Sequence, residues 1–129
     1  MNAPGGIPTE RQVQRAILEM CGKLFPDVFI HHSPNGAYLG SNPRDRAIRG
    51  GALKGDGTKK GFPDLLFVWN GGVAFIEVKR PKGSTTSDEQ KAVQERLTAL
   101  GWPVATAKSA NDAHAFLVEC GAPCKGTIA

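Results

Sequence analysis

The stretch that decides the fold is residues 64–79, which read "DLLFVWNGGVAFIEVK". Its two runs of apolar, often β-branched residues fit the pleated surface of a sheet. They flank Asn70-Gly71-Gly72, and such a turn signal between two apolar runs is typical of a β-hairpin. The sequence therefore predicts two antiparallel strands joined by a tight turn at Gly71 and Gly72.

The same stretch carries charged residues where a core strand would have apolar ones. A two-residue turn would put Leu66 opposite Glu77 and Asp64 opposite Lys79. Opposed residues share a face of the sheet, as do residues two apart in one strand. We therefore expect Asp64, Glu77 and Lys79 on one face, with Asp64 diagonal to Glu77. A three-residue turn would break this register.

The elements around the hairpin predict an α/β protein. Capping boxes start helices after Thr9 and Ser87, and a third helix follows Ser109. Residues 27–32 and 102–107 have the composition of further strands. The expected order is α-β-β-β-α-β-α, a mixed β-sheet flanked by helices. A long basic loop is expected between the first two strands.

Length and composition indicate one ordinary globular domain. The 129 residues suffice for a single core, and 40% hydrophobic with 22% charged residues is typical of a soluble protein. We expect one domain over 1–129, with 1–8 and 122–129 as loose tails. No apolar run could span a bilayer, and "MNAPGGIPTE" lacks the pattern of a signal peptide. Three cysteines do not suggest a disulfide framework, so we expect a cytoplasmic location.

The net charge of +4 is concentrated in one segment. Residues 44–60 hold six basic and two acidic side chains, so this segment alone accounts for the excess. A localised positive segment favours a polyanionic partner, most commonly nucleic acid. A solvated loop that keeps the protein soluble explains the charge equally well. The candidate DNA contacts are Arg44, Arg46, Arg49, Lys54, Lys59 and Lys60.

Two further polar residues are expected near the charged face of the hairpin. Glu10 and Gln90 lie at helix starts, in line with the apolar stripes of their helices. Each has an ordinary explanation, because Glu10 suits the helix dipole and Gln90 can close a capping box. Asp64 could likewise begin a strand, and Glu77 could pair with Lys79 on a solvated edge.

Together, these residues favour a site over a set of separate structural roles. Glu77 lies in a strand with apolar residues on both faces, and burying an unpaired carboxylate is costly. Two or three carboxylates on one face form a hard-oxygen site suited to Mg²⁺ or Mn²⁺. A lysine beside such a site suits phosphate chemistry, because it can stabilise negative charge in the transition state.

The arrangement resembles a known nuclease signature. Pro63-Asp64 followed by Glu77-Val78-Lys79 resembles the motif of the PD-(D/E)xK nucleases. The longer stretch "GFPDLLFVWNGGVAFIEVKRPKGSTTSDEQKAVQERLTALGWPV" resembles the virus-type replication-repair nuclease (VRR-NUC) domain. The resemblance extends over residues 9–118, and the small chain is similar to phage members. It implies a restriction-endonuclease-like fold and divalent-metal-dependent cleavage of DNA, in a bacterial or phage-infected host cell.

The resemblance also implies roles for individual residues. Asp64 and Glu77 would bind Mg²⁺ or Mn²⁺ together with the backbone carbonyl of Val78. Lys79 would orient or activate the attacking water and stabilise the charged phosphorane. The remaining two roles are supporting ones: Glu10 would help to hold the metal, and Gln90 would brace Lys79 or the water network.

The expected function is structure-specific cleavage of branched DNA, because the chain has no separate module for reading bases. A four-way (Holliday) junction fits this requirement, and its two symmetric cuts suggest a homodimer. Two alternatives stay open. One is a flap or fork nuclease that acts as a monomer, and the other is a nucleic-acid-binding subunit without catalytic activity.

Overall fold

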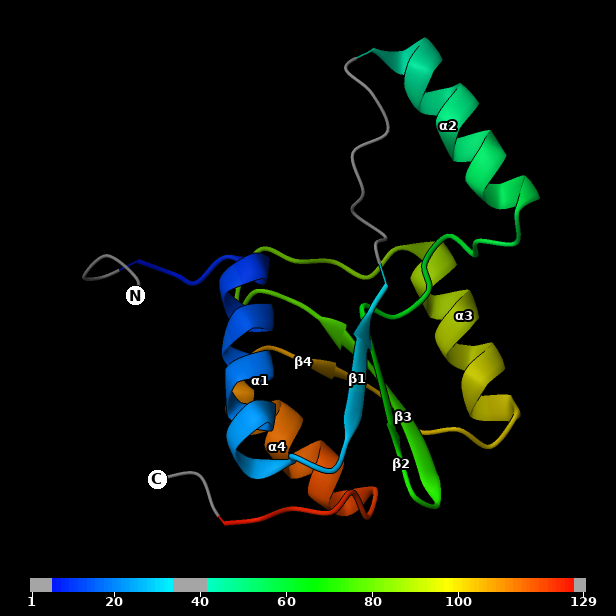
Figure 1. Cartoon of the computed structure of the whole chain (residues 1–129). Helices are drawn as coiled ribbons and strands as arrows, with labels where there is room; N and C mark the ends of the chain where they lie inside the picture. Colours follow the sequence, from blue (N-terminus) through cyan, green and yellow to red (C-terminus); the bar gives the residue numbers. More distant parts are fainter. Residues whose placement is uncertain (1–5, 34–41, 127–129) are drawn as a thin grey trace.

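The structure is a computed structural model that describes residues 6–33 and 42–126. Its elements follow in the order α1 (Glu10–Leu24), β1 (Phe29–His32), α2 (Pro43–Gly55), β2 (Leu65–Trp69), β3 (Gly72–Val78), α3 (Asp88–Ala99), β4 (Val104–Ala107) and α4 (Ala110–Glu119). Helices α1 and α4 cover one face of the sheet, and α3 lies on the other side (Figure 1). The predicted α/β class with a mixed sheet between helices is therefore confirmed.

The sheet has the strand order β1-β2-β3-β4. Strands β1, β2 and β3 are antiparallel neighbours, whereas β4 runs parallel to β3. A parallel pair needs a crossover, and α3 supplies it. The start of β2 and the end of β3 lie next to the start of α3, and the candidate site lies there.

Three predicted helix starts are confirmed. Thr9, Ser87 and Ser109 are the N-caps of α1, α3 and α4, and each side chain accepts a hydrogen bond from the third backbone N–H of its helix. Thr9 and Ser87 belong to full capping boxes. Each cap satisfies a backbone donor that would otherwise have no partner at a helix start.

The hydrophobic core lies between the sheet and the α1–α4 layer. Leu65, Phe67 and Ile76 are fully buried and pack with Ile17 of α1 and Leu117 of α4. These strand residues alternate with Leu66 and Glu77, which belong to the opposite face. The side chains that carry chemistry therefore lie on the α3 side, away from the main core.

The predicted hairpin is present, but its register is wrong by two positions. Trp69 pairs with Gly72, and Leu66 pairs with Phe75 instead of Glu77. The turn is therefore Asn70-Gly71, with Gly71 at φ +99°. Gly72 is the first residue of β3, and the Trp69 ring fills the space of a side chain there, 2.4 Å from where a Cβ would lie.

The basic segment was expected to be a loop, and this expectation is wrong because it contains α2. The Asn42 side chain accepts a hydrogen bond from Asp45 N at 2.9 Å, and Pro43 occupies the first helical position. A proline there carries no unsatisfied N–H and has the helical φ already. No residue of α2 is buried, and the helix stands apart from the sheet (Figure 1).

The end of the described chain also differs from expectation. Residues 122–126 were predicted as part of a loose tail, but they pack against the end of α1. Ala122 is buried, and Lys125 N donates a hydrogen bond to Leu24 O at 2.7 Å. Lys125 also forms an exposed ion pair with Asp27 at 3.4 Å.

Some expectations fall on residues that the structure does not describe. These are the loose ends at 1–5 and 127–129 and the part of the long loop after the first strand that covers residues 34–41. Within the described ranges, no helix combines the length and apolar character needed to cross a membrane.

Candidate active site

Asp64, Glu77 and Lys79 meet where the hairpin strands end. Asp64 directly precedes β2, Glu77 is the last residue but one of β3, and Lys79 directly follows that strand. Their exposed fractions are 8%, 1% and 7%, and within residues 6–33 and 42–126 no other charged or polar side chain is buried. Extending the observed register by one pair puts Asp64 directly opposite Glu77.

Asp64 is held in place by the ends of both neighbouring strands. Its Oδ2 accepts a hydrogen bond from Val78 N at 2.7 Å, and its backbone carbonyl accepts one from Ser33 N at 2.7 Å. The first contact ties the carboxylate to β3, and the second ties its backbone to the residue after β1. The position of Asp64 is therefore set by backbone groups rather than by flexible side chains.

Gln90, in the first turn of α3, links the two other charged residues. Its Oε1 accepts hydrogen bonds from Lys79 Nζ and from Ser87 N, each at 2.9 Å. Its Nε2 donates to Glu77 Oε1 at 3.0 Å. One amide thus closes the capping box and orients two buried charges. Lys79 Nζ also donates to the backbone carbonyl of Thr85 at 2.9 Å.

The charged form of Glu77 is destabilised more than that of any other member of this group. Its second oxygen, Oε2, is buried and has no hydrogen-bond donor in the described part of the chain. The pKa of the Glu77 carboxyl is raised to about 9, first by burial and then by the Asp64 carboxyl beside it. An ionised Asp64 offers only acceptors, so it can satisfy Glu77 only by sharing a proton.

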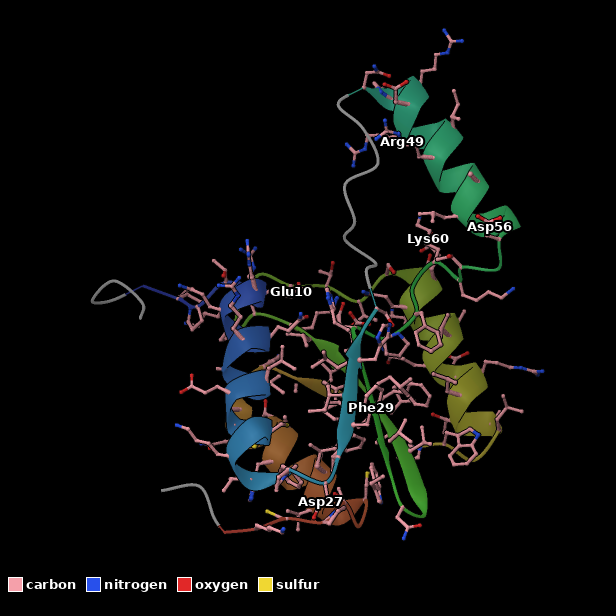
Figure 2. The ribbon with its side chains drawn as sticks, in the orientation of Figure 1. Glu10, Asp27, Phe29, Arg49, Asp56 and Lys60 are labelled. Atoms are coloured by element: carbon pink, nitrogen blue, oxygen red, sulfur yellow. The ribbon has the colours of Figure 1, made fainter. Side chains whose placement is uncertain are left out.

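Glu10, the first residue of α1 (Figure 2), is close enough to Asp64 for the two charges to interact. It stands in line with the buried Val13 and Ile17 of α1, as expected, but is itself largely exposed. Partial burial raises the pKa of Glu10, and repulsion from Asp64 raises it further, so the two carboxyls sense each other. Glu10 also lines an open pocket of about 360 Å³ with Lys79 and Arg80.

The donor set fits a hard divalent cation with few protein ligands. The described residues contain no cluster of three or more His, Cys, Asp or Glu side chains that could hold a metal. The buried carboxylates available to such a cation are the pair Asp64 and Glu77. A buried carboxylate oxygen without a donor suits a cation, and Mg²⁺ is commonly bound by one or two carboxylates with several waters.

The basic residues do not gather around this pair. Arg44, Arg46, Arg49 and Lys54 lie on α2, and Lys59 and Lys60 follow it. Figure 2 shows Arg49 on the outlying helix and Lys60 between that helix and α3. Lys60 forms an exposed ion pair with Glu89 of α3 at 3.2 Å.

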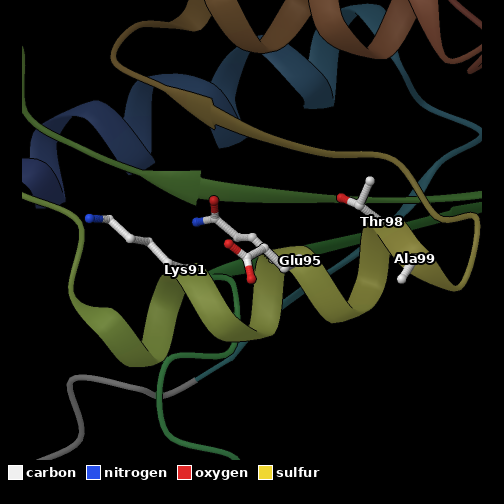
Figure 3. Close-up of a pocket in the computed structure, with 5 residues that line it drawn as sticks. Lys91, Glu95, Thr98 and Ala99 are labelled. Carbon is white, nitrogen blue, oxygen red and sulfur yellow. The ribbon is translucent and has the colours of Figure 1, made fainter.

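A larger hollow of about 490 Å³ lies elsewhere, along α3 (Figure 3). Its lining residues, Lys91, Gln94, Glu95, Thr98 and Ala99, all come from this one helix. Among the residues that the structure describes, none from a second element lines this hollow. A functional pocket normally has convergent groups from several elements, so chemistry favours the hairpin end over this larger hollow.

Sequence reasoning missed two contributors to the site. Thr85 acts through its backbone carbonyl, and because every residue has one, no residue type could signal it. Arg80 lines the pocket with Glu10 and lowers that group's pKa, opposing Asp64. Its position directly after Lys79 was the available signal.

A mixed sheet with paired carboxylates and a lysine at the end of a central hairpin defines an α/β domain with a restriction-endonuclease-like core. The VRR-NUC domain model matches residues 44–111, more than half of the sequence, so the chain belongs to this nuclease family. A solved structure described as a VRR_NUC domain protein is similar in fold, with a TM-score of 0.69. It is 24% identical, and the alignment covers 89% of each chain. The comparison with curated proteins gave no match.

Membership of the family has coarse functional consequences. It implies a nuclease with DNA as its substrate, in a family that generally depends on divalent metal ions. The particular DNA structure, the metal and the residue roles are the subject of the proposal below.

Proposed function

We propose that this protein is a Mg²⁺- or Mn²⁺-dependent, structure-specific endonuclease that hydrolyses phosphodiesters in branched DNA. The observation that carries the proposal is the buried pair Asp64–Glu77, in which Glu77 Oε2 has no hydrogen-bond donor among the described residues. A protein gains nothing in stability from such a pair, because two carboxylates repel each other in a low-dielectric site. A bound cation would make the arrangement favourable.

Asp64 and Glu77 are the proposed metal ligands, with the Val78 carbonyl and Glu10 in supporting roles. When bound, the cation would neutralise negative charge on the phosphate and lower the pKa of a bound water. The hydrogen bond from Val78 N uses one oxygen of Asp64 and limits how this carboxylate can turn. Glu10 adds negative charge at the rim, which favours a cation over an anion there.

Lys79 is the proposed orienting and charge-stabilising residue. An ammonium group has three donors, and two of them contact Thr85 and Gln90. The third can reach the attacking water or a phosphate oxygen. Because Lys79 forms no ion pair within 4.0 Å among the described residues, its charge is available to the substrate. Gln90 keeps the ammonium aimed in one direction.

The basic residues on and after α2 are proposed to bind the phosphate backbone. Arg44, Arg46 and Arg49 are all exposed, and none of them forms an ion pair with an acidic side chain of the described residues. Contacts to phosphates position DNA without reading bases. Recognition would then depend on the shape of the DNA, as branched substrates require.

A four-way junction is the preferred candidate substrate, cut by a homodimer. Resolving a symmetric junction requires one cut in each of two opposed strands. Two identical sites related by a two-fold axis match that symmetry. A monomer with one site would instead suit an asymmetric flap or fork.

The test compares linear duplex, flap and four-way-junction DNA with and without Mg²⁺ or Mn²⁺. We expect paired, symmetric nicks in the junction that require metal and disappear in Asp64→Asn. The matched control is Asp27→Asn, an exposed aspartate at the opposite end of α1, which should cut normally.

Each other outcome contradicts a defined part of the proposal. Single cuts confined to flap DNA would indicate the monomeric nuclease. Tight DNA binding without cleavage by any metal-loaded sample would indicate a binding subunit. Cleavage that survives Asp64→Asn would show that the catalytic site lies elsewhere.

A further inference from the structure

Gly61 lies against the start of α3 more closely than any other residue type could. A Cβ added at this position would be 2.5 Å from Glu89 C and 2.7 Å from both Glu89 O and Gln90 N. All three are backbone atoms, so no side chain can rotate away. The backbone of Gly61 also has φ +84°, a conformation that L-residues with side chains rarely adopt.

The peptide that Gly61 contacts is the one that presents Gln90. Gln90 N donates to Ser87 Oγ at 3.1 Å as half of the capping box. The Gln90 side chain then reaches Lys79 and Glu77 from the same backbone position. A shift of the 89–90 peptide would therefore change the cap and both contacts together.

The segment that follows Gly61 cannot easily move away from α3. Directly after Gly61, the Phe62 ring packs edge-on against Phe75, with centroids 5.6 Å apart. Pro63 is fully buried, and Asp64 is bonded to Val78 N. Because this segment is anchored to the sheet, a side chain at position 61 would displace the first turn of α3. Ordinary contact requires a displacement of roughly 1 Å.

We propose that Gly61 is a positioning residue whose missing side chain sets the distance between α3 and the hairpin, and thereby aims Gln90 at Glu77 and Lys79. This inference deepens the proposed nuclease function and rests on it for its effect on catalysis. Its structural part, the placement of Gln90, holds independently of any activity. Misplacing a catalytic arrangement by about 1 Å can cost about 10²-fold in rate.

Gly57 provides a matched control for this contact. It also has a left-handed backbone, with φ +102°, but nothing lies within 4 Å of its added Cβ. Gly57→Ala and Gly61→Ala therefore carry a similar backbone penalty, and only the second meets α3. A difference between them isolates the close approach from the cost of the backbone conformation.

The first measurement needs neither metal nor DNA. The side-chain amide signals of Gln90 are followed by ¹H–¹⁵N NMR in the metal-free protein and assigned with Gln90→Ala. We expect these signals to move in Gly61→Ala and to keep their wild-type positions in Gly57→Ala. If Gly61→Ala is partly unfolded, the spectra are recorded in trimethylamine N-oxide, which favours the folded state.

The second measurement is a double-mutant cycle on the cleavage rate. We expect Gly61→Ala to reduce kcat about 10²-fold in the wild-type background, but by less than about threefold in Gln90→Ala. Gly57→Ala should stay within about twofold of wild type in both backgrounds.

The two measurements separate the failure of the inference from that of the proposed function. Unmoved Gln90 signals in Gly61→Ala, or equal losses in both backgrounds, would overturn the positioning role. Moved Gln90 signals in a protein that cleaves no DNA would uphold the placement of Gln90 and overturn only the nuclease function.

Discussion

Gln90 Nε2 donates a hydrogen bond to Glu77 Oε1 at 3.0 Å, which joins the first turn of α3 to the end of β3. The same amide accepts a bond from Lys79 through its other end. A neutral group with one donor end and one acceptor end can hold a carboxylate and an ammonium apart while contacting both. Gln90 therefore fixes the positions of both side chains at the end of β3, where the proposed metal site lies.

Replacing Gln90 by Glu tests this two-ended contact. Glu keeps the capping box and the acceptor for Lys79, but it puts a third carboxylate beside Glu77 and removes its donor. We expect nuclease activity to fall about 10- to 100-fold, the usual cost of losing a partner of a metal ligand. Gln12→Glu is the control, because Gln12 has the same place in the capping box of α1. Equal activity of both variants would contradict this role of Gln90.

The pH dependence of the free energy of unfolding tests the raised pKa of Glu77. Its pKa rises from the ordinary 4.5 to about 9 on folding, so the folded protein holds an extra proton between these values. This contribution to stability is therefore fully present below pH 4.5 and is lost as the pH rises toward 9. In metal-free protein, urea unfolding at increasing pH should show a decline in the free energy of unfolding.

The isosteric variant Glu77→Gln should remove most of this decline. At pH 8 we expect it to be more stable than wild type by about 1–3 kcal/mol while it loses nuclease activity. Glu19→Gln is the control, since Glu19 is exposed and pairs only with Lys23 on the surface. A metal-free Glu77→Gln that is less stable than wild type would show that the native carboxylate is already satisfied.

Metal binding can be measured without any substrate. Mg²⁺ or Mn²⁺ should raise the Tm of the wild-type protein, with a stabilisation of about 2.7 kcal/mol when the ion is at 100 times its Kd. Asp64→Asn removes one of two buried ligands and should abolish most of the shift. Asp27→Asn should shift as wild type does, because Asp27 lies at the opposite end of α1 from Glu10 (Figure 2). An equal shift in both variants would mean that the ion binds elsewhere.

The salt dependence of DNA binding tests the role of α2. Each phosphate contact contributes about 0.9 to the slope of log K against log salt concentration. Replacing Arg44, Arg46 and Arg49 with Ala should therefore lower the slope by up to about 3 and weaken binding to all DNA sequences alike. Lys23→Ala, an exposed lysine near the end of α1, should leave the slope unchanged. A loss of affinity without a change in slope would argue against phosphate contacts.

In the hairpin prediction, the face of each side chain was right but the register was wrong. Moving the turn from Gly71-Gly72 to Asn70-Gly71 shifts the pairing by two positions, and strand side chains alternate with a period of two. The shift therefore changes which residues are opposed but keeps Asp64, Glu77 and Lys79 on the same face. The run Asn70-Gly71-Gly72 allows either pair of neighbouring residues to form the turn, and the structure uses Asn70-Gly71.

In the basic segment, a helix-start signal was outweighed by features that favour a loop. Asn42-Pro43 with Asp45 is a standard helix start, but Gly50 and Gly51 and the absence of an apolar stripe favoured a loop. The helix forms with no buried residue, so burial periodicity could not have found it. Its caps were the readable signal.

The sequence by itself determined every element except α2, the caps of α1, α3 and α4, and the shared face of Asp64, Glu77 and Lys79. These follow from local chemistry: apolar periodicity, the hydrogen-bonding needs of helix ends and the alternation of side chains along a strand. Only the tertiary structure decided that Gln90 bonds Lys79 and Glu77, that Thr85 receives Lys79, and that Gly61 lies against α3. Those relationships depend on ångström-scale distances between segments far apart in the chain, and such distances are set by packing.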